Sequence, residues 1–143
     1  MLLAVDPGAS SGWALFDVGA RVLVRAGVAR PVARFERVDR IAIEVPQAYP
    51  DERVPFGDLV KVAVIAGRWI GAHPEAQAVT TYFPRDWKGQ LPKAIGNQRT
   101  LGELSESECA VIEYPRDAKG RTDVLDAIGI GLVHLGRLRR GLV

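Results

Sequence analysis

The chain opens on Leu2-Leu3-Ala4-Val5-Asp6-Pro7-Gly8, an apolar run that leads directly into a carboxylate and a turn. A run of this composition predicts a β-strand over residues 2–6 with both faces buried. An aspartate at the end of a buried strand is costly unless it is paired or coordinated. Asp6 is therefore either a turn residue that caps its own backbone or a member of a polar site.

Three further carboxylates stand in equally apolar surroundings. Glu44 ends the run Ile41-Ala42-Ile43, and Asp123 and Asp126 begin the apolar pattern of the last predicted helix. Residues three apart share a helical face, so these two aspartates point the same way. Asp123 could instead cap the helix and Asp126 could be solvated, but Glu44 is harder to explain because glutamate is a poor strand residue. If all four converge, they form an oxygen-rich site that suits Mg²⁺ or Mn²⁺, as in two-metal nucleases.

Composition excludes several classes of protein. The chain has 143 residues, 48% of them hydrophobic and 25% charged, which predicts a single globular domain over residues 1–143. No apolar run is long enough to span a bilayer, and the N-terminus lacks the features of a signal peptide. One cysteine, Cys109, excludes an internal disulfide and a cysteine zinc cluster, and its apolar neighbours predict that it is buried. We therefore expect a cytoplasmic protein, in a bacterial or phage-infected cell, with no membrane partner.

The charge balance changes once the four carboxylates are set aside. The chain has 19 Lys and Arg residues against 17 Asp and Glu, so 13 acidic residues remain and the excess becomes +6. An acidic site within a basic surface suits an enzyme that acts on a polyanion. Arginine outnumbers lysine by 15 to 4, which favours bidentate phosphate binding but would also follow from a GC-rich or thermophilic genome.

Hydrophobic periodicity predicts an α/β protein. Strands are expected at 2–6, 13–16, 21–28, 40–45 and 78–83, and helices at 57–71, 93–101, 105–113 and from 122 to a basic tail at 137–140. A loop rich in proline and acid is expected at 46–55, and a charged loop at 115–121, with Thr122 as the N-cap of the last helix. The expected sheet is five-stranded and mixed, with three antiparallel strands followed by parallel strands, and helices flank it.

Three blocks of the sequence resemble the RuvC-type Holliday-junction resolvases of the RNase H-like (retroviral integrase) superfamily. They are Val5-Asp6-Pro7-Gly8 with Gly12-Trp13-Ala14-Leu15, then Ile43-Glu44, and finally residues 122–130. The blocks follow the family's order and span nearly the whole chain. Residues 84–93 are similar to the bacteriophage branch of the family, whereas residues 45–50 depart from the family's usual continuation after the glutamate.

The resemblance implies an RNase H-like fold and a metal-dependent endonuclease that resolves four-way DNA junctions by paired symmetric nicks. Asp6 would bridge two Mg²⁺ ions, for which Mn²⁺ can substitute, and Glu44, Asp123 and Asp126 would complete their coordination. One ion would activate the attacking water and the other would stabilise the leaving 3′-oxygen. Two symmetric nicks imply a two-fold homodimer, and the helix at 57–71 is the expected pairing surface.

The side chains expected to contact branched DNA are basic or aromatic. Lysines and arginines of this set would contact the phosphate backbone, and the aromatic residues would stack on unpaired bases or serve as half-buried loop anchors. The set comprises Lys88, Lys93, Arg85, Arg121, Tyr49 and Phe56. Trp87 and the other tryptophans are expected to pack in the core or in loops, and His134 to lie in the core or at an interface.

Three other functions share some of these features. An RNase H-like nuclease that cuts RNA–DNA hybrids or flaps would carry the same metal site. A non-catalytic junction-binding protein would carry a degenerate site, but all four carboxylates are present. An actin-like or sugar-kinase ATP-binding fold also opens on a strand with Asp-x-Gly, but it needs a duplicated domain for which 143 residues are too few.

Overall fold

The computed structural model describes residues 1–50 and 53–140, so residues 51–52 of the expected acidic loop lie outside the described part. In chain order the elements are β1 (Leu2–Asp6), β2 (Ser11–Asp17), β3 (Val22–Ala29), β4 (Arg40–Glu44), α1 (Phe56–Gly71), β5 (Ala78–Tyr82), α2 (Pro84–Trp87), α3 (Lys93–Gly102), α4 (Glu106–Ala110) and α5 (Ala118–His134). Among the described residues, no helix is long and apolar enough to cross a membrane.

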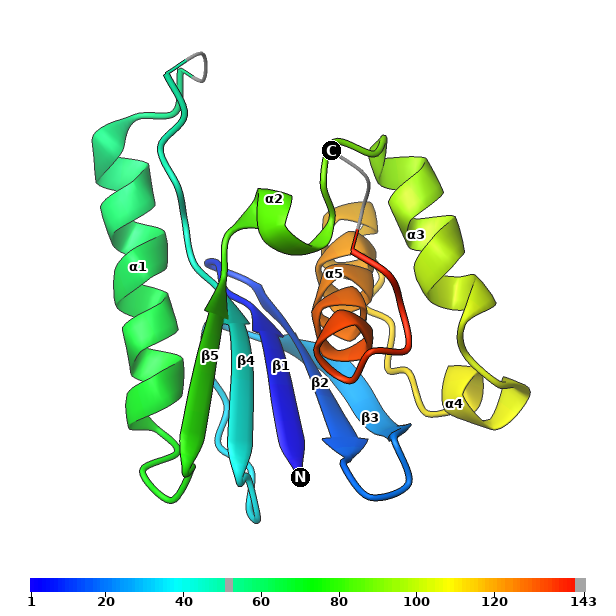
Figure 1. The fold of residues 1–143 in the computed structure, drawn as a ribbon. Helices are drawn as coiled ribbons and strands as arrows, with labels where there is room; N and C mark the ends of the chain where they lie inside the picture. The colour runs from blue at the N-terminus through cyan, green and yellow to red at the C-terminus, as the bar shows by residue number, and fades with distance from the viewer. Residues whose placement is uncertain (51–52, 141–143) are drawn as a thin grey trace.

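The five strands form one mixed sheet in the order β3-β2-β1-β4-β5 (Figure 1). β2 pairs antiparallel with both β1 and β3, whereas β4 pairs parallel with both β1 and β5. The predicted α/β architecture is therefore confirmed. Because β1 and β4 run in the same direction, their carboxyl ends meet at one edge of the sheet, where Asp6 and Glu44 are their last residues.

Side-chain alternation separates the sheet into two buried faces. Ala4 and Ala42 pack in the cluster that contains α5, whereas Val5 and Ile43 pack in the cluster that contains Trp69 of α1. Figure 1 shows α1 on one side of the sheet and α5, with α3 and α4, on the other. Successive strand residues point to opposite faces, so the last residues of β1 and β4 lie on the α5 side.

Helix α5 lies unusually close to the sheet because glycine occupies the points of contact. A Cβ atom placed on Gly12 would lie 1.8 Å from the Asp123 carbonyl oxygen, and one on Gly131 would lie 2.1 Å from the Phe16 ring. Gly12 is also the register partner of Asp6. The helix is buried from Asp123 to Val133, and this close approach brings its first carboxylate to the end of β1.

The start of α5 corrects the predicted N-cap. The cap is Asp117, whose side chain accepts a hydrogen bond of 2.7 Å from the Gly120 amide, and not Thr122. Thr122 lies inside the helix, where its hydroxyl donates to the Ala118 carbonyl. The expected loop at 115–121 therefore ends four residues early. Lys119-Gly120 interrupts the apolar periodicity, which is why the pattern alone places the start too late.

The end of α5 corrects the predicted basic last turn. The helix ends at His134, and Gly136 follows with φ of 69°. The Gly136 amide donates to the Val133 carbonyl and the Arg137 amide to the Leu132 carbonyl, which is the Schellman arrangement that terminates helices at a left-handed glycine. The arginines at 137, 139 and 140 thus follow the helix and do not belong to it.

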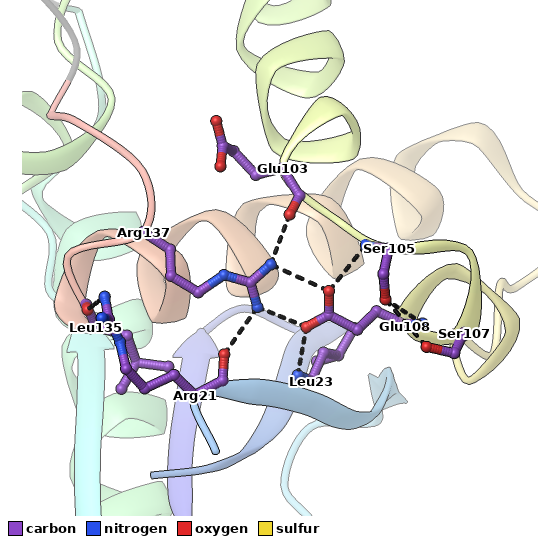
Figure 2. A network of polar contacts seen from close by, with 8 residues as sticks. All are labelled: Arg21, Leu23, Glu103, Ser105, Ser107, Glu108, Leu135 and Arg137. Carbon is purple, nitrogen blue, oxygen red and sulfur yellow. Dashed lines mark hydrogen bonds and ion pairs between the residues drawn. The ribbon is translucent and has the colours of Figure 1, made fainter. Parts of the chain in front are cut away.

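Arg137 instead forms a buried ion pair with Glu108 of α4 (Figure 2). The two Glu108 oxygens accept from the guanidinium at 2.5 and 3.0 Å, and also from the Leu23 amide at 2.7 Å and the Ser105 amide at 2.9 Å. Arg137 also donates to two backbone carbonyls. The hydrogen bonds from Arg137, and then those from the two amides, lower the pKa of Glu108 to about 2 against the opposing effect of desolvation.

The same contact explains two errors around α4. Ser105 and Glu108 form the predicted capping box, but the helix ends at Ala110 and not near residue 113. The chain then turns to the edge of β3, where the Glu113 amide donates to the Ala26 carbonyl at 2.8 Å. Cys109 was expected to be buried and is exposed, because its neighbour Glu108 takes the inward position beside the guanidinium.

Candidate active site

The four carboxylates singled out in the sequence lie at one place, where the ends of β1 and β4 meet the first half of α5. Asp6 and Glu44 are half-buried, and Asp123 and Asp126 are buried. Desolvation, followed by the charges of Glu44 and Asp126 and then of Asp123, raises the pKa of Asp6 well above its usual range. The fold therefore brings four carboxylates together where they are shielded from water. They can all be ionised there only if cations lie nearby.

Lys88, the residue directly after α2, is a cation that faces two of these carboxylates. Its Nζ lies 3.7 Å from Glu44 Oε2 and 3.8 Å from Asp126 Oδ2. Desolvation raises the pKa of both carboxyls, and the Lys88 ammonium offsets part of that rise. Burial acts to lower the pKa of Lys88, but the charges of Glu44, Asp126 and Asp6 raise it on balance, so the side chain stays protonated.

Trp87 makes a second contact with the cluster. Its Nε1–H donates to Glu44 Oε2 at 2.6 Å. The tryptophan is buried as expected, and its ring packs on α5 at Gly129, where a Cβ atom would lie only 2.7 Å from the ring. Helix α2 follows β5 directly and lies beyond the ends of β4 and β5 (Figure 1). No sequence pattern singles out the hydrogen bond, because four residues carry no helical periodicity.

Lys119 is a site residue that the sequence interpretation missed. Its Nζ lies 2.9 Å from Asp123 Oδ2, and this hydrogen bond is the main cause that raises the pKa of Lys119. The two residues are four apart on α5, a spacing that pairs opposite charges on one helical face. The signal was present in the sequence, but it is visible only if the helix begins at Ala118.

These lysines bear on how the site could hold a metal ion. Within residues 1–50 and 53–140, no three or more His, Cys, Asp or Glu side chains have the spacing of a metal site as they stand. Lys88 lies between Glu44 and Asp126, and Lys119 contacts Asp123. The donor set nevertheless fits Mg²⁺, which prefers carboxylate oxygen, and the raised pKa of Asp6 indicates a cluster in need of more positive charge.

Two cavities lie on either side of Lys88. One has a volume of about 180 Å³ and is lined by Asp126, Lys93 and the residues of α2 and α3 around them. The other has a volume of about 400 Å³ and is lined by Glu44, Tyr49 and their neighbours. Lys88 lines both cavities. Lys93 and Tyr49, two of the predicted DNA contacts, therefore lie beside the carboxylates.

The remaining predicted DNA contacts lie on the surface around this site. The Arg85 guanidinium carbon lies 4.0 Å from the centre of the Tyr49 ring, so a base could stack on that face of the ring only if Arg85 moved. Arg121 is exposed, and its Nε donates to the Pro115 carbonyl. Phe56 begins α1 with 79% of its surface exposed.

His134 lies at the other end of α5 from the carboxylates. Its Nδ1 is 2.9 Å from the Tyr82 hydroxyl oxygen, and the two rings meet edge to face. Desolvation, followed by the charge of Arg40, lowers the pKa of His134. The residue is thus a half-buried packing histidine, as expected, and it does not reach the carboxylates.

Comparison with known proteins adds evidence on the fold. No protein-family model matches the chain, and no curated protein does. A Thermus thermophilus RuvC structure is similar, with a TM-score of 0.56 and 16% sequence identity over 97% of this chain and 98% of that chain. T. thermophilus RuvC in complex with a Holliday junction substrate is similar at a TM-score of 0.53 and the same identity and coverage. The chain therefore has the RuvC-like, RNase H-like fold that its three sequence blocks predicted.

Proposed function

We propose that this protein is a metal-dependent, structure-selective endonuclease that resolves four-way DNA junctions by paired symmetric nicks. The observation that carries the proposal is the convergence of Asp6, Glu44, Asp123 and Asp126 at the strand ends of a RuvC-like fold. One of the similar structures contains a Holliday junction substrate, which makes branched DNA the first substrate to test.

The four carboxylates would hold two Mg²⁺ ions, with Mn²⁺ as a substitute. When bound, such ions activate the attacking water and stabilise the leaving 3′-oxygen of a phosphodiester. Lys88 neutralises Glu44 and Asp126 in the present arrangement. If other cations took its place beside these carboxylates, the Lys88 ammonium would be free to neutralise a substrate phosphate.

The DNA would lie over the face that carries Lys88 and Lys93. These two lysines would contact the phosphate backbone, with Arg85 and Arg121 as outer contacts. Tyr49 and Phe56 would stack on unpaired bases near the crossover, Tyr49 after Arg85 moves from its ring, and the exposed Phe56 directly. The assignment to the bacteriophage branch rests on residues 84–93 alone and stays a prediction.

We infer that the outer face of α1 pairs two copies of the chain. Val60 and Val64 are one helical turn apart on this face, and they are 44% and 58% exposed. A pair of apolar residues on an exposed helix face favours association with another apolar surface. A two-fold dimer would supply one carboxylate site to each of the two strands that must be cut.

Cleavage of a synthetic mobile four-way junction tests the proposal. The wild type should nick two strands symmetrically with Mg²⁺ or Mn²⁺ and leave 5′-phosphate and 3′-hydroxyl ends. Asp6→Asn should bind the junction and not cut it. Asp17→Asn is the matched control, since Asp17 is an exposed carboxylate at the opposite end of the sheet from Asp6.

Parallel substrates distinguish the other functions. Equal cleavage of a linear RNA–DNA hybrid or a flap would replace junction resolution with a broader RNase H-like activity. Junction binding with no cleavage in either metal would identify a non-catalytic binding protein. Metal-dependent nicking that survives Asp6→Asn would refute the assignment of the carboxylates.

A further inference from the structure

We propose that Trp87 is a positioning residue for Glu44: its indole N–H fixes one carboxylate oxygen, so that the other stays available to a metal ion. This inference rests on the metal-dependent function proposed above. It assigns a specific task to a tryptophan that the sequence places only in loop or core packing.

The geometry of the contact is that of a strong hydrogen bond. Trp87 Nε1 lies 2.6 Å from Glu44 Oε2, and the Glu44 side chain is 14% exposed. Hydrogen bonds to ionised acceptors are short and are stronger where water is excluded. Within the described residues, Glu44 Oε1 accepts no hydrogen bond, so the tryptophan restrains one oxygen and leaves the other free.

The donor itself is held in place by packing. Trp87 is 5% exposed, and its ring lies against Gly129 so closely that a methyl group there would overlap it. The preceding turn is fixed by a hydrogen bond of 3.0 Å from the Phe83 amide to Asp86 Oδ2. A packed ring on a capped turn presents its N–H at a fixed position. Glu44 would then already be oriented, and its side chain would lose little entropy when a metal ion binds.

The chemistry of indole also suits this task. Indole N–H is a donor only and carries no charge, so it orients a carboxylate without competing with a metal cation for it. Lys88 also faces Glu44 Oε2, at 3.7 Å, but its flexible ammonium can turn to the substrate. Trp87 would keep Glu44 oriented after that movement, which the lysine cannot do.

If Trp87 served only to pack the core, the loss of its N–H would not affect metal binding. Replacing its indole with benzothiophene distinguishes this packing role from orientation of Glu44. This isostere keeps the ring shape and removes only the N–H. Trp87→Phe is the genetic counterpart, and Trp69→Phe is its matched control. Trp69 is also buried, and its Nε1–H donates to the Ser11 hydroxyl at 3.1 Å on the α1 side of the sheet, so its replacement removes an indole N–H that contacts no carboxylate within the described residues.

The experiment measures Mn²⁺ affinity by electron paramagnetic resonance, and thermal unfolding without metal, on the full chain. Removing a partner that orients a metal ligand typically weakens metal binding 10–100-fold. We expect a loss of roughly tenfold or more for both changes at Trp87 and little change for Trp69→Phe. In a Glu44→Gln background, the Trp87 changes should cause no further loss, because the effect acts through Glu44.

Two results overturn the inference. The benzothiophene variant could bind Mn²⁺ as tightly as the wild type, which would reduce Trp87 to packing. Alternatively, the loss could persist in the Glu44→Gln background, which would mean that Trp87 acts elsewhere. A wild type that binds no Mn²⁺ at all would instead refute the proposed metal-dependent function.

Discussion

The buried pair of Glu108 and Arg137 should make the fold sensitive to acid over a defined range of pH. Four donors converge on Glu108 and lower its pKa from an ordinary value of 4.5 to about 2. A group whose pKa is depressed by folding stabilises the fold above its unfolded pKa. This contribution is lost as the pH falls through the folded pKa. The relevant window therefore runs from pH 4.5 down to about 2.

The magnitude follows from the shift in pKa. One pKa unit corresponds to about 1.4 kcal/mol, so this shift gives about 3 kcal/mol at neutral pH. Solvent screening does not reduce the figure much, because the Glu108 side chain is only 5% exposed. Removing one partner of a buried pair typically costs about 3–5 kcal/mol, which agrees with the linkage value.

Urea denaturation of the wild type and Glu108→Gln at several pH values tests this reasoning. The variant should be less stable by about 3 kcal/mol at pH 7, and the difference should shrink below pH 4.5 and nearly disappear at pH 2. The control is Glu113→Gln, which breaks the exposed pair with Arg25 at 2.8 Å and should cost under about 1 kcal/mol. A stability difference for Glu108→Gln that stays constant from pH 7 to pH 3 would refute the assigned cause.

Three further predictions concern the site and its surroundings. Asp6→Asn should raise the free energy of unfolding in EDTA by about 1 kcal/mol, because it removes a charge that desolvation and then like-charge repulsion disfavour. A calorimetric melting temperature below the wild type's would contradict this. Gly12→Ala should destabilise the fold by about 3 kcal/mol in urea, because its Cβ would meet the Asp123 carbonyl; a neutral effect would disprove the close approach. Val64→Glu should give a folded monomer in sedimentation equilibrium, and an unchanged dimer would exclude the α1 face.

Much of the site could be predicted from sequence because two regular rules determine it. Alternation along parallel strands places Asp6 and Glu44 at the same edge and on the same face of the sheet. Helical spacing places Asp123 and Asp126 together on the facing helix. Each rule requires only the order of the residues and apolar neighbours around the charged ones. Both patterns are clear in this sequence.

The parts that sequence reasoning missed depend on contacts between distant segments. The Trp87 hydrogen bond and the Lys88 ion pairs come from a four-residue helix and the residue that follows it, whose positions are set by β5 and α5 and not by a local pattern. Cys109 was predicted to be buried because its neighbours in the sequence are apolar. The inward position is instead taken by Glu108, whose partner Arg137 lies 29 residues away. Neither contact has a local signal.

The carboxylates and the lysines that contact them indicate how a site of this kind folds before it binds a ligand. Asp123 and Asp126 lie on a helix that is buried for eleven consecutive residues, so the fold cannot form without desolvating them. Lys119, on the first turn of the same helix, contacts the first, and Lys88, which follows α2, contacts the second. Both lysines are more exposed than the carboxylates they contact, with 74% and 37% of their side chains accessible. The chain thus offsets part of the charge of its buried acids with lysines exposed enough to move away, as the proposed metal-dependent function would require.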